Sequence, residues 1–184
     1  MRILLVFIVL FGSSIAMAKT DSDPGDTFWS SLQSLCGKAY SGKVVEAPSS
    51  DTTFKGKQLS MYVFSCQLEK IKIRVAVGDD RSRTWLIYRY EGRFLLKHDH
   101  RKNGKADGVT DYGGWTSNSG SATMQVFPAD QETFAKIPEA SSNVWWINLE
   151  SGKQFTYNLH RIGTDRKYSL RFDLTKTVPF LLEK

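Results

Sequence analysis

The chain has 184 residues, 41% of them hydrophobic and 12% aromatic, and a formal net charge of +6. This length suits one domain with a sizeable hydrophobic core rather than two domains. Lysines and arginines are interspersed with acidic residues, which is typical of a solvated mixed-charge surface. Because there is no clustered basic tract, the sequence predicts no nucleic-acid partner.

The N-terminal residues predict an exported protein. Arg2 forms a short positive region, residues 3–11 are an unbroken apolar run, and Ala16-Met17-Ala18 has the small-x-small pattern of a cleavage site. The run is too short to span a bilayer and no cysteine follows the cleavage point, so we expect a cleaved signal peptide over residues 1–18. Its removal would lower the net charge from +6 to +5, because Arg2 is its only charged residue. We expect the remaining chain to be secreted or periplasmic, with no integral membrane segment.

The two cysteines, Cys36 and Cys66, are predicted to form a disulfide, because an oxidising compartment favours pairing over free thiols. A bridge that closes a loop of this size contributes about 3–4 kcal/mol in the chain-entropy account. Two buried thiols or a metal pair are the alternatives, although neither cysteine has zinc-ligand spacing.

Residues 19–25 are a polar leader, and residues 26–184 are predicted to form one domain. Apolar residues first recur with helical spacing at Phe28, Trp29, Leu32, Leu35 and Cys36. A short amphipathic helix is therefore expected, beginning at Asp23-Pro24 or Asp26 and ending at Gly37.

Beyond this helix the hydrophobic period changes to two, which predicts strands. The alternation is clearest over residues 71–77, and similar segments cover residues 38–46, 59–67, 84–90, 93–100, 121–127, 143–150, 154–161 and 166–174. Glycine-containing turns, among them Gly113-Gly114, separate these segments and favour antiparallel neighbours. The clearest hairpins join 84–90 with 93–100 and 143–150 with 154–161. A second short helix is expected between Pro128 and Pro138, beginning near Asp130.

Nine antiparallel strands must close into a barrel or stack as a sandwich to bury their apolar faces. We predict a mainly β protein, an antiparallel up-and-down β-barrel with a short N-terminal helix and one further short helix. By fold analogy this architecture is similar to that of lipocalins and other calycins. A β-sandwich is the alternative.

Four stretches carry a resemblance to a group of secreted bacterial β-rich proteins that have no assigned activity. They are Arg83-Thr84-Trp85, residues 96–101, Tyr112-Gly113-Gly114 and residues 127–133. The resemblance covers most of the mature chain and implies the same export route and a single β-rich domain. It implies no cofactor and no site residue.

Histidines form the first candidate site. His98 and His100 are two residues apart on a predicted strand, so both imidazoles face the same way, at the end of a stripe that carries Phe94 and Leu96. Such a pair could bind a transition metal if a third ligand approached, and His160 is the only other histidine. Alternatively, His98 and His100 bind no metal and are simply polar residues at the end of a strand.

Aromatic residues form the second candidate site, because they could surround an apolar or sugar-like ligand. The predicted ligand-binding residues are Trp85, Tyr88, Tyr112, Trp115, Trp145 and Trp146; Tyr90 and Tyr157 belong to the same group. Trp145 and Trp146 are adjacent in a strand and must point to opposite faces. A third group could hold a carboxylate or phosphate, or else pair with neighbouring acids: Arg81, Arg83, Arg89, Arg93 and Arg101.

The predicted function is a non-enzymatic binding protein for a small apolar or aromatic ligand, or for a cell-envelope macromolecule. A metal-dependent site on His98 and His100 is one alternative. A loop-mediated inhibitor or assembly factor, acting through residues 101–120, is another. No motif requires a cofactor, and the sequence has no nucleophile elbow, zinc-binding helix or phosphate-binding loop. No catalytic residue is predicted, although a site built from distant segments stays open.

Overall fold

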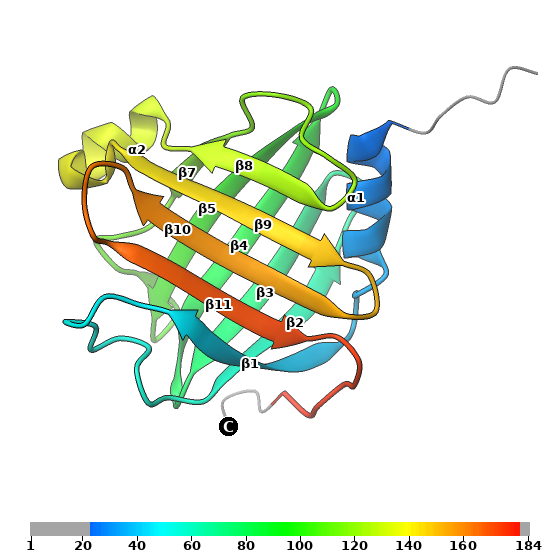
Figure 1. The fold of residues 1–184 in the computed structure, drawn as a ribbon, viewed down its shortest axis with the longest axis horizontal. Coiled ribbons are helices and arrows are strands. Elements are labelled where there is room, and N and C mark those ends of the chain that lie inside the picture. Colours follow the sequence, from blue (N-terminus) through cyan, green and yellow to red (C-terminus); the bar gives the residue numbers. More distant parts are fainter. Residues whose placement is uncertain (1–22, 181–184) are drawn as a thin grey trace, which may run out of the picture.

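The computed structural model describes residues 23–180, in which eleven strands form one antiparallel sheet that curls into a barrel-like shape (Figure 1). The elements in chain order are α1 (Pro24–Gln33), β1 (Ala39–Glu46), β2 (Leu59–Cys66), β3 (Lys70–Val77), β4 (Asp80–Tyr90), β5 (Arg93–Lys102), β6 (Lys105–Ala106), β7 (Tyr112–Trp115), β8 (Met124–Pro128), α2 (Gln131–Lys136), the short 3-10 helix η1 (Pro138–Ala140), β9 (Asn143–Glu150), β10 (Gln154–Arg161) and β11 (Lys167–Asp173). This confirms the mainly β, antiparallel barrel-like fold with a short N-terminal helix and one further helix. The predicted signal peptide lies outside the described residues. Neither helix of the described part has the length and apolar character needed to cross a bilayer.

The strand order is β6-β5-β4-β3-β2-β1-β11-β10-β9-β8, with β7 paired to β5. Almost every strand therefore pairs with its neighbour in sequence. One exception is β7, which pairs with β5. The other joins the first strand to the last, where Gly42 of β1 lies opposite Phe172 of β11. Both predicted hairpins are confirmed, because β4 pairs with β5 and β9 pairs with β10. One continuous hydrogen-bonded path therefore replaces the two separate sheets of a sandwich.

One end of the barrel is covered by α1, which appears beside the ends of the strands at the right of Figure 1. The Asp23 carboxylate accepts a hydrogen bond from the Gly25 N–H at 2.7 Å and caps the helix. On the inner side of α1, Phe28 is fully buried and Trp29 almost so. Both rings pack on Phe94 of β5, with centroids 5.6 and 5.8 Å apart. This aromatic contact closes that end of the interior.

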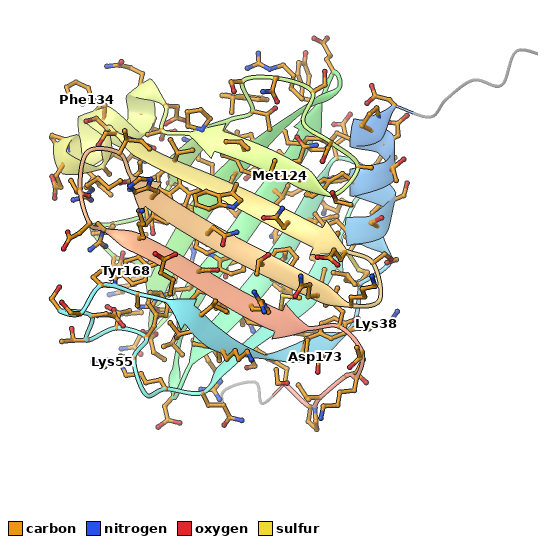
Figure 2. All side chains as sticks on the ribbon, viewed as in Figure 1. Lys38, Lys55, Met124, Phe134, Tyr168 and Asp173 are labelled. Carbon is orange, nitrogen blue, oxygen red and sulfur yellow. A yellow bond between two sulfur atoms is a disulfide. The ribbon has the colours of Figure 1, made fainter. Side chains whose placement is uncertain are left out.

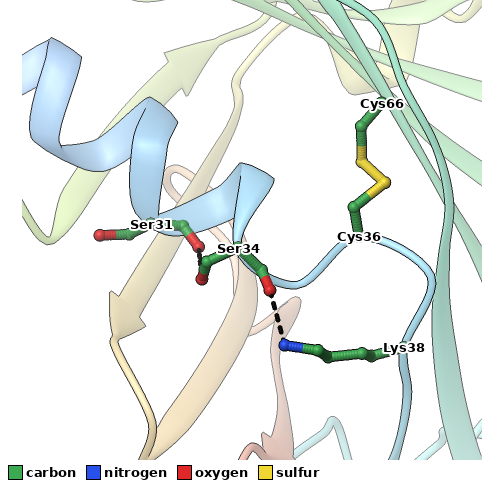
Figure 3. Close-up of a disulfide and its surroundings, with 5 residues drawn as sticks. All are labelled: Ser31, Ser34, Cys36, Lys38 and Cys66. Atoms are coloured by element: carbon green, nitrogen blue, oxygen red, sulfur yellow. Dashed lines mark hydrogen bonds between the residues drawn. A yellow bond between two sulfur atoms is a disulfide. The ribbon is translucent and has the colours of Figure 1, made fainter.

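The Cys36–Cys66 disulfide is present and joins the segment after α1 to the end of β2 (Figure 3). Beside it, the Gly37 N–H donates to the Val63 carbonyl at 2.8 Å. The covalent bond and the backbone hydrogen bond together fix the covering helix to the sheet.

Strand β7, which branches from β5, meets β8, the last strand of the hydrogen-bonded path, along a line that we call the seam. A Cβ atom at Gly113 would lie 1.9 Å from the Leu96 carbonyl oxygen, and one at Gly114 would lie 1.8 Å from that of Pro128. Only glycine allows both approaches. The expected turn at Gly113-Gly114 is therefore wrong, because the pair lies inside β7 and lets neighbouring backbones come close.

Helix α2 fastens the seam. Its N-cap residue Asp130 donates its N–H to the Gly113 carbonyl at 2.9 Å. The buried hydroxyl of Thr133 accepts from the Gly113 N–H at 2.6 Å and donates to the same carbonyl at 2.7 Å. Across the seam, the Lys97 ammonium of β5 lies 2.8 Å from the Asp130 carboxylate and 2.6 Å from that of Glu132. Backbone and side-chain contacts thus close the barrel where strand pairing ends.

Replacing both cysteines by serine should lower the free energy of unfolding by about 3–4 kcal/mol, because the bridge joins residues 30 apart in sequence. Urea unfolding of the oxidised protein and of the Cys36→Ser/Cys66→Ser variant measures this difference. A difference below about 1 kcal/mol would show that the bridge adds little to the fold.

Thr133→Val should lower the free energy of unfolding by about 1–3 kcal/mol, because it keeps the side-chain shape and leaves the buried Gly113 N–H without its partner. Thermal and urea unfolding report the loss. Thr52→Val, at an exposed position, is the matched control and should stay close to the wild type. Equal stability of the two variants would contradict the assigned role of the hydroxyl.

Candidate functional site

The end of the barrel opposite α1 is open, and we call it the mouth. A pocket of about 350 Å³ lies there, among the first residues of β4 and β9, the last residues of β5 and β10, and the loops at this end of the barrel. Aromatic side chains make up much of its wall: Phe54, Tyr112, Trp145, Tyr157 and Tyr168. We call this the mouth pocket. Figure 2 shows Tyr168 and Lys55 at this end of the molecule, and Lys38 and Asp173 at the end that carries α1.

A histidine lies beneath the floor of the mouth pocket. His98 is buried and its Nδ1 lies 3.0 Å from the Tyr112 carbonyl, so this nitrogen must donate, since a carbonyl only accepts. Its Nε2 then accepts from the Tyr157 hydroxyl at 2.7 Å. Burial lowers the pKa of His98 to about 3 and raises that of Tyr157 well above 10. The pair is therefore neutral at physiological pH.

The indole of Trp145 completes the floor and leaves a donor unused. Trp145 is 1% exposed and its ring centroid lies 5.3 Å from that of His98. The Trp145 Nε1–H lies near the Tyr157 hydroxyl without reaching full hydrogen-bond geometry. Its effect is to lower the pKa of Tyr157, but burial raises that pKa by more. A buried N–H without a full hydrogen bond costs about 1–3 kcal/mol.

His100 lies one step closer to the mouth, where it meets Tyr112 and Arg83. Its Nε2 is 3.2 Å from the Tyr112 hydroxyl, and its Nδ1 is 4.0 Å from the Asp107 carboxylate. Burial lowers the pKa of His100, and the charge of Arg83 lowers it further. Burial also raises the pKa of Tyr112 to about 12. This wall of the pocket therefore offers neutral hydrogen-bonding groups beside one guanidinium.

Two further arginines lie at the rim. The Arg161 Nε–H donates to the Asn143 side-chain oxygen at 3.0 Å, and the Arg166 guanidinium lies 5.2 Å from the centre of the Tyr168 ring. Burial lowers the pKa of Arg161, and the nearby charge of Arg166 lowers it further. The two like charges thus lie close together at the open end.

The loop between β1 and β2 supplies another part of the rim, beside Tyr168. The Asp51 carboxylate accepts hydrogen bonds from the backbone N–H groups of Thr53, Phe54 and Lys55, and one from the Tyr168 hydroxyl at 3.2 Å. The Phe54 ring is thereby held 5.3 Å from the Tyr168 ring in an edge-on arrangement. This rim is built by packing and hydrogen bonds from two distant parts of the sequence.

The predicted ligand-binding aromatics divide into three groups. Tyr112 and Trp145 line the mouth pocket. Trp85 is buried deeper and stacks on Tyr157, with ring centroids 4.2 Å apart. Tyr88 and Trp115 lie on the outer face of the sheet, beside a separate hollow.

Trp146 also faces outward, since its neighbour Trp145 points inward. Within the loop over residues 101–120, Val109 and Tyr112 belong to the mouth pocket, and Trp115 is 37% exposed beneath the Arg93 guanidinium. This loop therefore contributes both to the rim and to the outer surface.

The three histidines do not come together. His98 and His100 share the inner face of β5, as strand periodicity predicts, whereas His160 lies in β10 with its Nε2 3.3 Å from the Thr164 carbonyl at the surface. Both nitrogens of His98 are already hydrogen-bonded within the protein. Over residues 23–180, no three side chains of His, Cys, Asp and Glu gather closely enough to hold a metal ion.

Most of the arginine group near the β4–β5 hairpin is occupied by ion pairs. Arg83 pairs with Asp80 at 2.5 Å, Arg101 pairs with Asp99 at 2.9 Å, and Arg89 pairs with an acid of α1. Of the predicted group only Arg83 lines the mouth pocket. Sequence reasoning missed Arg161. Strand periodicity could have found it, because every second residue of β10 from Phe155 to Arg161 faces inward, just as every second residue of β5 from Phe94 to His100 does.

The free energy of unfolding should fall as the pH drops below about 6.5. The reason is that His98 has a pKa of about 6.5 in the unfolded chain but about 3 in the folded protein, so the unfolded state binds the proton first. One such group contributes a slope of about 1.4 kcal/mol per pH unit at most, and His100 acts in the same direction. His98→Gln should flatten the slope between about pH 6.5 and about pH 4, as measured by urea unfolding. His160→Gln, on the outer face, is the control and should keep the wild-type slope. An unchanged slope in His98→Gln would contradict a neutral buried imidazole.

A scan against protein-family models and a search of curated proteins both found no match for this sequence.

Proposed function

We propose that this protein is an exported, non-enzymatic binding protein that holds a small ligand with a planar aromatic part in the mouth pocket. The carrying observation is the pocket of about 350 Å³ at the open end, whose wall is largely aromatic. Pockets of about 300–1,000 Å³ lined by aromatic residues and a few polar groups are typical of small-molecule sites.

The walls favour a planar ligand over a flexible chain. Tyr112 stacks on His98 with centroids 4.4 Å apart and planes 5° apart, and its ring lies 5.9 Å from that of Trp145. Rings fixed in this way lose little freedom when a further ring packs against them, and such aromatic pairs contribute about 0.5–1.5 kcal/mol beyond burial of their area. The interior below is filled by side chains such as Trp85 and Phe155, so the ligand would stop at this floor.

Export is the second part of the proposal. Residues 1–18 have the pattern of a cleavable signal peptide, and the Cys36–Cys66 bridge is of a kind that persists in oxidising compartments. Mass spectrometry of the protein purified from periplasm and culture medium tests this directly. A mature N-terminus at Lys19 is expected, and retention of residues 1–18 on an otherwise cytosolic, reduced protein would contradict it.

The neutral fluorophore phenylnaphthylamine should bind with saturation at one site per chain, because its rings can pack between Tyr112 and the pocket wall. Tyr112→Ala should weaken this binding about tenfold, the equivalent of one lost aromatic contact. Fluorescence titration of the purified protein measures both affinities.

Two further variants make the result specific. Phe54→Ala changes the rim loop rather than a strand, so it should weaken the probe without unfolding the protein. Trp115→Ala removes an aromatic residue of the same strand as Tyr112, but on the outer face, and should leave the affinity unchanged. If Trp115→Ala abolished binding and the other two variants did not, the probe would occupy the outer hollow and the proposed function would fall.

A further inference from the structure

We infer that the ligand of the mouth pocket carries an oxyanion, such as a carboxylate or sulfonate, which Arg161 and Arg166 bind at the rim while the planar part packs on the floor. This inference rests on the proposed function and specifies its ligand class.

The lining of the mouth pocket has a net positive charge, which favours an anionic ligand. Three arginines, Arg83, Arg161 and Arg166, face one acid, Glu139, which gives the lining a net charge of three minus one, or +2. Glu139 is exposed at the rim. His100 adds no charge at neutral pH, because burial and the charge of Arg83 lower its pKa. The pocket is therefore positive at the side where a ligand would arrive.

Two of these cations have no ion pair among residues 23–180. Arg83 is satisfied by Asp80 at 2.5 Å. Within the described part of the chain, neither Arg161 nor Arg166 has a carboxylate within 4.0 Å. Two other acids of this end are engaged elsewhere, since Asp51 accepts from backbone N–H groups and Asp107 faces His100. The charge of Glu139 acts on Arg161, but at more than ion-pair distance.

Both rim guanidiniums are held in place by neighbouring side chains. Asn143 is 5% exposed and holds the Arg161 Nε–H, which leaves the two terminal nitrogens of that guanidinium free to bind a ligand. The Tyr168 ring supports the Arg166 guanidinium from one side. A planar guanidinium fixed at its inner nitrogen or on its face is suited to bidentate binding of an oxyanion, which would also relieve the repulsion between the two arginines.

The orientation of the ligand follows from this arrangement. The anion would stay at the rim, where water still reaches the exposed Arg166, and the apolar ring would enter toward Trp145. The reverse orientation would bury the charge beside the neutral His98–Tyr157 pair, where burial raises the pKa of Tyr157 more than the charges of Arg166 and Arg83 lower it. The inference therefore assigns different chemistry to the two ends of one ligand.

The test uses two probes with the same ring skeleton, anilinonaphthalene sulfonate, which is anionic, and phenylnaphthylamine, which is neutral. Each is titrated by fluorescence against the purified protein, and competition between them shows whether they share one site. We expect the anionic probe to bind about tenfold more tightly or better, and added salt to weaken only the anionic probe.

The Arg161→Gln/Arg166→Gln variant should bind the anionic probe about 10–100-fold more weakly, as expected for loss of hydrogen bonds to a charged group, and the neutral probe about as the wild type does. Glu139→Gln should bind the anionic probe more tightly, because it removes the acid of the lining. Lys167→Gln removes one positive charge beside Arg166 outside the pocket and is the matched control, which should leave both affinities unchanged.

The outcomes distinguish failure of the anionic-ligand inference from failure of the proposed function. Equal affinity for both probes, with no effect of the double variant, would overturn the anionic ligand and leave the proposed function standing. An equal loss in Lys167→Gln and the double variant would mean general charge attraction and would also overturn it. If neither probe bound to the folded protein, the proposed function would fail, and this inference with it.

Discussion

The architecture depends on bringing the two ends of a long curled sheet together at the seam. Pairing cannot complete the circle there, because β7 is only four residues long and adds to β5 alone. Close backbone approach replaces pairing, which the missing side chains of Gly113 and Gly114 allow. The Thr133 hydroxyl and the Lys97 ion pairs then hold the two sides. Tyr112 and η1 flank this contact, so the wall of the mouth pocket is a direct product of the closure.

The interior changes in character along the barrel axis, and the cost of desolvation explains the order. Next to α1 the inward side chains are apolar, as with Phe94 and Leu149. In the middle come aromatic and neutral polar groups, where burial lowers the pKa of His98 so far that it stays uncharged. Permanent cations such as Arg161 occur only at the rim, where water reaches them. The polarity of the pocket thus follows its depth.

Local pattern was sufficient to predict most of the elements. Alternation identified strands such as β3, β9 and β10 almost to the residue, and Asp130 with Pro138 bounded α2 correctly. Strand β7 was missed because a Tyr-Gly-Gly-Trp segment has too little apolar alternation and reads as a turn. Its role comes from how closely other backbones approach, which no local pattern records.

The candidate site was predicted only in part, because periodicity assigns a residue to a face and says nothing about which strand ends meet. His98 and His100 were correctly placed on one face, but His160 lies on the other side of its strand. The same limit separates Tyr112, which lines the pocket, from Tyr88 and Trp115 on the outer face. Arg161 and Arg166 meet the β1–β2 loop at the pocket because β11 pairs with both β1 and β10, a neighbourhood set by the closure of the whole barrel.

The pairing of β1 with β11 also has a consequence for how the chain folds. Gly42 and Phe172 lie opposite each other although 172 minus 42, or 130, positions separate them in sequence. As the chain emerges from its N-terminus, α1, the disulfide and the β2–β5 meander can assemble from nearby segments, whereas β1 keeps an unpaired edge until β11, the last strand, arrives. Such an edge can pair with another chain, so an interrupted chain that lacks β11 is the form of this protein most prone to aggregate. Completion of the barrel removes that edge and forms the mouth in the same step.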